Sequence, residues 1–309
     1  MKKILIFASA VVAALFAGSC QSEEAYDVQE EVTVTLSLEL PKDVQTKAMS
    51  LAENTDVVYY EIWNSDWTKK LYPPTSAAPT YLEVENGQAT LSLTLVSSQT
   101  YNFIFWAQNK DCGAYDVTDL KSVKVDYSVI AANGNQDKFD AFYAVKEIAV
   151  TGPINETITL YRPFAQLNFG SNTMETTFGD VTVGATSITV SRLATTFNTI
   201  SGYGEDEVTD VEFKATGLAT DAESLVVAGT PYTWISMNYM LMMADHDAVE
   251  VNAVFDLGMD EPVKHNVGNV PLKENYRTNI VGDLFTTDAK LIIVIDPDFL
   301  QPDEDIFLN

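Results

Sequence analysis

Few residues of this chain have types and spacings that could do chemistry. His246 lies between Asp245 and Asp247, where a neighbouring carboxylate could orient the imidazole ring as a general base. The sequence has no Gly-x-Ser-x-Gly turn and no His-Glu-x-x-His pair, and His265 is 19 positions from His246. We therefore interpret Asp245–Asp247 as a solvated loop, and we expect no catalytic residues and no enzymatic activity.

The 2 cysteines and 2 histidines are too few for a disulfide framework, or for a zinc site with three or four such ligands. Cys112 stands in a Lys-Asp-Cys-Gly-Ala stretch, far from Cys20. We interpret Cys112 as a buried or half-buried free thiol and not as a nucleophile. Cys20, the other cysteine, belongs to the N-terminal export segment described below and is therefore not expected to pair with Cys112.

Two acidic clusters, at residues 204–210 and 296–305, could supply the oxygen ligands that calcium prefers. Neither has the spaced acids and the glycine of an EF-hand loop. We interpret both as solubilising loops, and we expect no metal and no cofactor. The 44 acidic residues against 18 basic ones give a formal net charge of −26, which repels nucleic acid.

The first twenty residues predict export. Two lysines precede an apolar run over residues 4–17, and Ala-Gly-Ser then leads to Cys20, which predicts a signal peptide over residues 1–19 with cleavage between Ser19 and Cys20. The run is shorter than the roughly 18 residues that a membrane-spanning helix needs. We expect Cys20 to be acylated, as in a bacterial lipoprotein, and to anchor the chain to a membrane; an ordinary secretory peptide is the alternative. The acidic residues 20–30 predict a flexible tether.

Alternation of apolar and polar residues predicts β-strands along most of the chain. Residues 31–40 alternate without error and place Val32, Val34, Leu36, Leu38 and Leu40 on one face. Further strands are expected at 57–63, 89–95, 101–107, 122–127, 157–161, 164–169, 187–190, 208–213, 225–227, 233–241, 248–255, 276–280 and 290–295. Since no sustained 3.6-residue periodicity accompanies them, we predict an all-β chain of antiparallel β-sandwiches with little helix.

The turn-forming stretch Gly152-Pro153-Ile154-Asn155 is a candidate boundary between two sandwiches. It would divide the chain into an N-terminal sandwich over residues 31–153 and a C-terminal sandwich over residues 154–309. A turn inside one larger domain would give the same pattern, so both arrangements stay open.

Several segments, in their order and spacing, resemble the fimbrillin-like lipoproteins of Bacteroidetes, the type V pilin superfamily. They are the start through Cys20, VTVTLSLELP with Gln-Thr-Lys47-Ala48 behind it, DAFY at 140–143, LYRPFAQLNFG at 160–170, WISMNYML at 234–241 and VPLKENYRTNIVGDLFT at 270–286. The acids behind Cys20 resemble the surface-export signal of such lipoproteins. The resemblance implies two tandem transthyretin-like sandwiches on the outer face of an outer membrane, with other pilin-like subunits as partners.

In that family, subunits join by strand donation after a protease cuts behind the first strand. The resemblance places the cut between Lys47 and Ala48, although arginine is the usual residue before it, and makes residues 31–40 a candidate removable strand. A sandwich without that strand exposes apolar surface and unpaired backbone, which a strand from a neighbour would cover. Residues 31–40 could equally be the permanent first strand of the first sandwich.

The candidate donor strand is the apolar segment Lys290–Leu300, in which Leu291, Ile293 and Ile295 alternate with Ile292 and Val294. Such a near-continuous apolar run is typical of a strand buried on both faces. The segment could instead close the sheet of its own subunit.

Together these features favour an outer-surface lipoprotein that acts as a fimbrial subunit or anchor and supports adhesion to a ligand that the sequence does not identify. The alternative is a monomeric surface lipoprotein that binds a glycan or a protein. In that case Trp63, Trp67 and Tyr72, beside the proline-rich residues 72–79, would form a stacking platform.

Overall fold

The computed structural model describes residues 30–41, 54–74, 79–172, 183–219, 224–245, 248–286 and 290–296. Strands dominate these residues, and their one α-helix is α1, the four-residue Tyr127–Ile130. Asp126 caps α1 by accepting a hydrogen bond from Ser128 N at 2.9 Å. The predicted all-β class is therefore confirmed. Among the described residues, no helix has the length and apolar character needed to cross a membrane.

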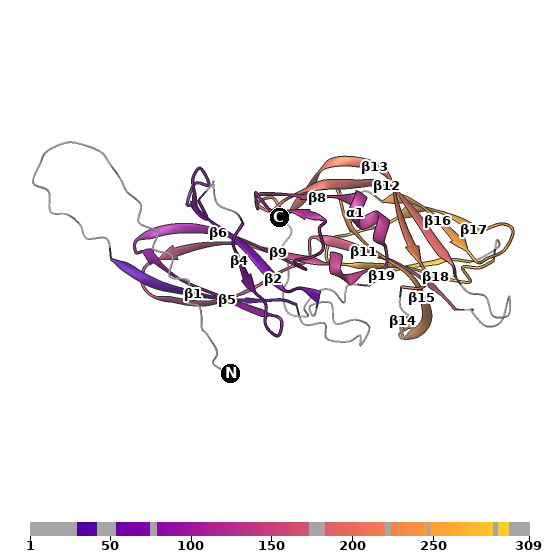
Figure 1. Cartoon of the computed structure of the whole chain (residues 1–309), viewed down its shortest axis with the longest axis horizontal. Coiled ribbons are helices and arrows are strands. Elements are labelled where there is room, and N and C mark those ends of the chain that lie inside the picture. Colours follow the sequence, from indigo (N-terminus) through magenta and orange to yellow (C-terminus); the bar gives the residue numbers. More distant parts are fainter. Residues whose placement is uncertain are drawn as a thin grey trace, which may run out of the picture.

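The first of two lobes is a sandwich of two sheets (Figure 1). One sheet has the order β10-β1-β5, with β1 at Glu31–Glu39, β5 at Gln88–Val96 and β10 at Ile154–Thr159. The other has the order β3-β2-β6-β9, with β2 at Val57–Asn64, β3 at Lys70–Tyr72, β6 at Gln99–Gln108 and β9 at Ala141–Val150; β4 (Tyr81–Glu83) also pairs with β2. Alternate residues of both sheets meet in one apolar core.

The second lobe is a larger sandwich. One sheet has the order β14-β15-β11-β18-β19, with β11 at Phe164–Ser171, β14 at Ser224–Val227, β15 at Thr230–Leu241, β18 at Arg277–Gly282 and β19 at Ile292–Asp296. The other has the order β17-β16-β12-β8-β7, with β7 at Tyr115–Asp116, β8 at Ser122–Val125, β12 at Ala185–Asn198, β16 at Val249–Asp256 and β17 at Val263–Val270; β13 (Tyr203–Thr216) also pairs with β12. Phe169 and Phe255 pack edge to face at 5.8 Å and join the two sheets.

Residue 153 does not separate the strands of the first lobe from those of the second. β7 and β8 precede this residue, yet β8 pairs with β12 of the second lobe. β10 follows it, yet pairs with β1 of the first. The chain thus crosses between the lobes three times, after β6, before β9 and after β10. The division at residue 153 as a boundary between independent domains stays a prediction.

The acidic residues 204–210 lie in β13 and not in a loop, so the loop interpretation was wrong. β12 and β13 form a long antiparallel hairpin, and the acids of residues 204–210 are exposed along it. Arg192 of β12 binds Glu207 across the hairpin at 2.5 Å and Asp245 at 2.6 Å. These hydrogen bonds raise the pKa of the Arg192 guanidinium, Asp245 first and Glu207 second. Arg192 thus offsets part of the negative charge of this strand at the surface of the hairpin.

Candidate functional site

β1, the predicted removable strand, lies between two strands of its own chain. It pairs antiparallel with β5 from Glu31 to Glu39 and parallel with β10 from Val34 to Glu39. The five apolar side chains of its inner face are at most 7% exposed: Val32, Val34, Leu36, Leu38 and Leu40. Loss of this strand would leave an apolar slot with unpaired backbone on both sides.

Several predicted site residues lie outside the described residues. They are the signal cleavage site at Ser19 and Cys20, the lipidation site at Cys20, and the proteolytic site at Lys47 and Ala48. His246 and most of the acidic segment 296–305 lie outside them as well. The expectations for these residues stay predictions.

The predicted donor segment forms the edge strand β19 in the sheet of its own subunit. It pairs antiparallel with β18, from Val281↔Ile292 to Arg277↔Asp296. Leu291 and Ile293 pack against the core of the second lobe, whereas Ile292 is 56% and Ile295 46% exposed. Ile295 therefore does not share the burial of Leu291 and Ile293. Within the part of the chain that the structure describes, β19 pairs with β18 along one side, and its residues are half-buried or exposed.

Two of the sequence segments that carry the family resemblance meet in a buried ion pair. Asp140 accepts hydrogen bonds from Nε and Nη2 of Arg162 at 2.6 and 2.7 Å. The guanidinium also lies over the ring of Phe142, 4.7 Å from its centre. Just beyond the pair, Tyr143 and Tyr161 exchange backbone hydrogen bonds of 2.8 Å. A bidentate pair of this kind fixes both distance and angle between the two segments.

A second buried acid lies beside this pair. Asp137 accepts a hydrogen bond from the hydroxyl of Tyr239 at 3.1 Å. Burial, and after it the nearby charge of Asp140, raise the pKa of the Asp137 carboxyl to about 7. Sequence reasoning missed this acid, because nothing in its neighbours predicts that a residue in a polar stretch will be buried.

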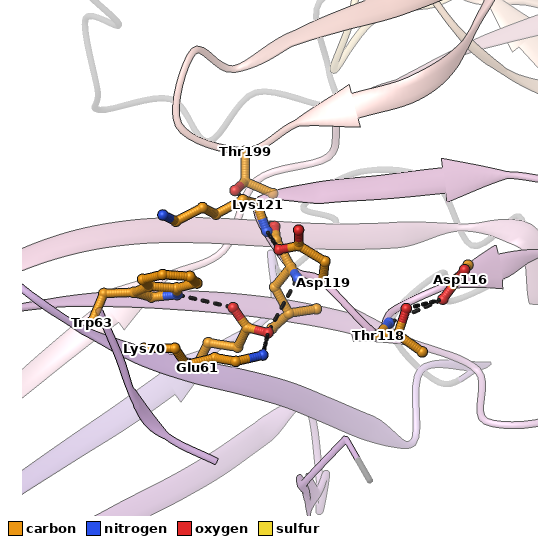
Figure 2. A network of polar contacts seen from close by, with 9 residues as sticks. Glu61, Trp63, Lys70, Asp116, Thr118, Asp119, Lys121 and Thr199 are labelled. Carbon is orange, nitrogen blue, oxygen red and sulfur yellow. Dashed lines mark hydrogen bonds and ion pairs between the residues drawn. The ribbon is translucent and has the colours of Figure 1, made fainter. Parts of the chain in front are cut away.

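Glu61 of β2 is the centre of a polar network between the lobes (Figure 2). Its carboxylate accepts hydrogen bonds from Trp63 Nε1 at 2.9 Å, Lys70 Nζ at 2.9 Å and Leu120 N at 3.3 Å. Leu120 lies between β7 and β8 of the second lobe, and its carbonyl accepts a hydrogen bond of 2.8 Å from Thr199 at the tip of the β12–β13 hairpin. One carboxylate thus connects elements of both lobes.

Of the aromatic residues proposed as a stacking platform, Trp63 and Trp67 lie together, with ring centres 6.5 Å apart, and Tyr72 packs against a different core. Nζ of Lys121 lies 3.3 Å from the centre of the Trp63 ring and donates a hydrogen bond of 2.7 Å to the carbonyl of Trp67. Tyr72 stacks instead on Tyr60, with ring centres 5.4 Å apart. A sugar ring on Trp63 would have to displace the lysine on that face. The glycan-binding role of these residues stays a prediction.

Two further residues with reactive side chains are Cys112 and His265. Cys112 is buried and free, as predicted, and burial raises the pKa of its thiol. His265 lies 2.7 Å from the carbonyl oxygen of Leu284 through Nε2. Within the described ranges, no group of three or more His, Cys, Asp or Glu side chains could hold a metal ion.

Comparison with known proteins gives a family and a fold. The chain matches the family of unknown function DUF6562 over residues 25–308. No curated protein matches it significantly.

Solved structures share the fold at low sequence identity. A candidate cell adhesion protein from Bacteroides ovatus is 11% identical, with a TM-score of 0.52 over 86% of this chain and 98% of that one. A candidate cell adhesion protein from Bacteroides uniformis is 13% identical, with a TM-score of 0.51 over 90% and 100%. A candidate adhesin from Bacteroides thetaiotaomicron is 11% identical, with a TM-score of 0.50 over 88% and 98%. At these identities the similarity shows the fold.

Proposed function

We propose, for a chain that belongs to the family of unknown function DUF6562, the function of an outer-surface lipoprotein that serves as a fimbrial subunit or anchor and supports adhesion. In this proposal Cys20 carries the lipid, and subunits join by donation of a β-strand. The proposal includes no catalytic activity.

The observation that carries the proposal is the position of β1. An N-terminal strand with five buried apolar side chains lies in the middle of its sheet and not at an edge. It is joined to the rest of the first lobe through residues 42–53, which include Lys47. A cut there would leave β1 held by backbone hydrogen bonds and apolar contacts alone. A strand from a second subunit offers the same hydrogen bonds and the same alternation of side chains.

β19 supports the proposal from the donor side. When an edge strand leaves its sheet, it loses the hydrogen bonds to a single neighbouring strand. Ile292 and Ile295 of β19 already expose apolar surface. The low-identity adhesins described above share the fold, which agrees with a role at the cell surface. The arrangement of Trp63 under Lys121 gives the alternative, a monomeric glycan-binding protein, no comparable support.

The proposal is tested by limited digestion of the chain without residues 1–19, using a protease that cuts after lysine. We expect loss of the segment that contains β1, followed by a ladder of denaturant-resistant polymers on a gel. K42A/K47A is the control, because it removes both lysines of residues 42–53 and should therefore keep β1 attached and prevent the ladder. A wild-type chain that is cut at Lys47, loses β1 and yet stays monomeric would contradict strand donation.

A further inference from the structure

One side of the first lobe is open between two edge strands. β9 ends one sheet of the sandwich and β10 ends the other, so each has one edge without a strand partner among the described residues. The two strands follow each other in the chain across the short turn at residues 151–153, and a bridge joins Tyr143 before the middle of β9 to Tyr161 after β10. Free backbone groups on such edges can pair with an extended segment of another chain.

The inner row of β9 contains one charged residue. Four members of the row belong to the apolar core: Phe142, Ala144, Ile148 and Val150. Lys146 occupies the position between Ala144 and Ile148 and lies opposite Phe103 of β6, which is fully buried. Because side chains alternate along a strand, the ammonium group of Lys146 lies on the core side of this edge.

The inner row of β10 has the same feature with the opposite sign. Ile154 and Ile158 pack against the core, and Glu156 lies between them, opposite Leu36 of β1. Lys146 Nζ and Glu156 Oε1 are 2.6 Å apart, and the two side chains are 42% and 34% exposed. The ion pair therefore spans the open side of the sandwich from one edge strand to the other, with its charged groups still in contact with water.

The other lobe approaches the same side of the first lobe. A groove of about 440 Å³ runs between β9, β10 and the tip of the β12–β13 hairpin, Thr199–Gly202. Gly202 has a positive φ of 76°, and a Cβ atom there would lie 3.2 Å from the hydroxyl of Tyr143. The hairpin tip thus approaches β9 closely, and a loop over an edge is a further obstacle to strand addition.

We propose that Lys146 and Glu156 act as an edge guard, which keeps extended segments of other chains, in the first place a second copy of this protein, from pairing with β9 or β10. A strand added to either edge would remove water from both charges, and desolvation of an ion pair costs more than its attraction returns unless further hydrogen bonds form. The inner row of β5, the edge strand at the other end of the β10-β1-β5 sheet, contains no charge. The inference concerns the uncut chain and does not depend on strand donation.

The test compares self-association of the uncut chain without residues 1–19 by size-exclusion chromatography with light scattering over a range of concentrations. We expect the K146V/E156V variant to form dimers or larger species with an apparent dissociation constant at least tenfold lower than that of the wild type. Its midpoint of thermal unfolding should not fall, because two valines extend the apolar rows. The milder K146M/E156Q variant should shift in the same direction, which keeps the test valid if the valine variant does not fold.

Two controls separate the guard from a general effect of charge. K146E/E156K reverses the pair and should stay as monomeric as the wild type. E147T/K69T removes one charge of each sign from exposed positions, one of them on the outer face of β9, and should also leave the association unchanged. Equal association of the wild type and both neutral variants would overturn the proposal, and so would association of K146E/E156K as strong as that of the valine variant.

Discussion

The ion pair of Asp140 and Arg162 links two of the three places where the chain passes from one lobe to the other. Asp140 precedes β9, where the chain enters the first lobe, and Arg162 follows β10, where the chain leaves it. Both side chains are 1% exposed, and two hydrogen bonds hold the carboxylate against the guanidinium. The geometry of the junction therefore depends on one ion pair that water does not reach.

Replacement of Asp140 by alanine should leave the guanidinium of Arg162 buried without its carboxylate. Removal of one partner of a buried pair costs about 3–5 kcal/mol of unfolding free energy. The D140L/R162M variant should recover much of this loss, since it removes both charges together. Unfolding in urea, followed by tryptophan fluorescence, measures each free energy.

Arg192→Ala is the matched control for that experiment, because Arg192 pairs with Glu207 and Asp245 at the surface. Its free energy of unfolding should change little. If Asp140→Ala were no more damaging than Arg192→Ala, the buried pair would not hold the junction.

The stability of the chain should depend on pH through Asp137. Burial and the charge of Asp140 give this carboxyl a pKa of about 7 in the folded chain, above its ordinary value of 3.8. The folded form therefore binds the proton more tightly, and this contribution to stability is fully present below about pH 4 and is lost as the pH rises through about 7. Asp137→Asn removes the titration, so the stability of the variant relative to the wild type should rise between about pH 4 and pH 7.

The measurement is the free energy of unfolding of both proteins at several pH values across this range. The difference between variant and wild type carries the information, because titration of other groups cancels in it. A difference that stays constant with pH would contradict the raised pKa of Asp137.

The sequence predicts strands well where one face is apolar and the other polar. The alternation predicts a strand at residues 31–40, and β1 lies at Glu31–Glu39; it predicts another at 89–95, and β5 lies at Gln88–Val96. β9 was not predicted, because Lys146 interrupts its apolar row and Tyr143 adds an aromatic ring to the other face. Lys146, which interrupts the apolar alternation of β9, is also one of the two residues that we propose as the edge guard.

The candidate site was predictable only in part. The inner row of β1 follows directly from alternation. The pair of Asp140 and Arg162 does not, because its members are 22 positions apart and meet through the turn of the chain between β9 and β10. Two segments that carried the resemblance contained these residues, yet a single sequence holds no information on which charged residues meet in space.

Gly204 should tolerate no side chain. It lies in β13 against the segment after β15, and a Cβ atom there would lie 2.0 Å from the carbonyl oxygen of Met242 and 2.6 Å from Cβ of Ala194. Since the first of these is backbone, Gly204→Ala should lower the midpoint of thermal unfolding by many degrees, or prevent folding. Gly152→Ala is the control, because nothing lies within 4 Å of its Cβ position. Equal midpoints for the two variants would contradict the close approach of β13 to Met242.

Leu36→Ala should weaken the binding of β1 between β5 and β10. Leu36 is fully buried at the middle of the strand, and loss of such a side chain costs about 2–5 kcal/mol. In the uncut chain this cost appears as a lower free energy of unfolding. After a cut at Lys47 it should appear as faster release of the fragment that contains β1, measured by chromatography at successive times. Thr33→Ala, on the exposed face of the same strand, should release the fragment at the wild-type rate. Equal release rates for the two variants would mean that apolar burial does not hold the cut strand.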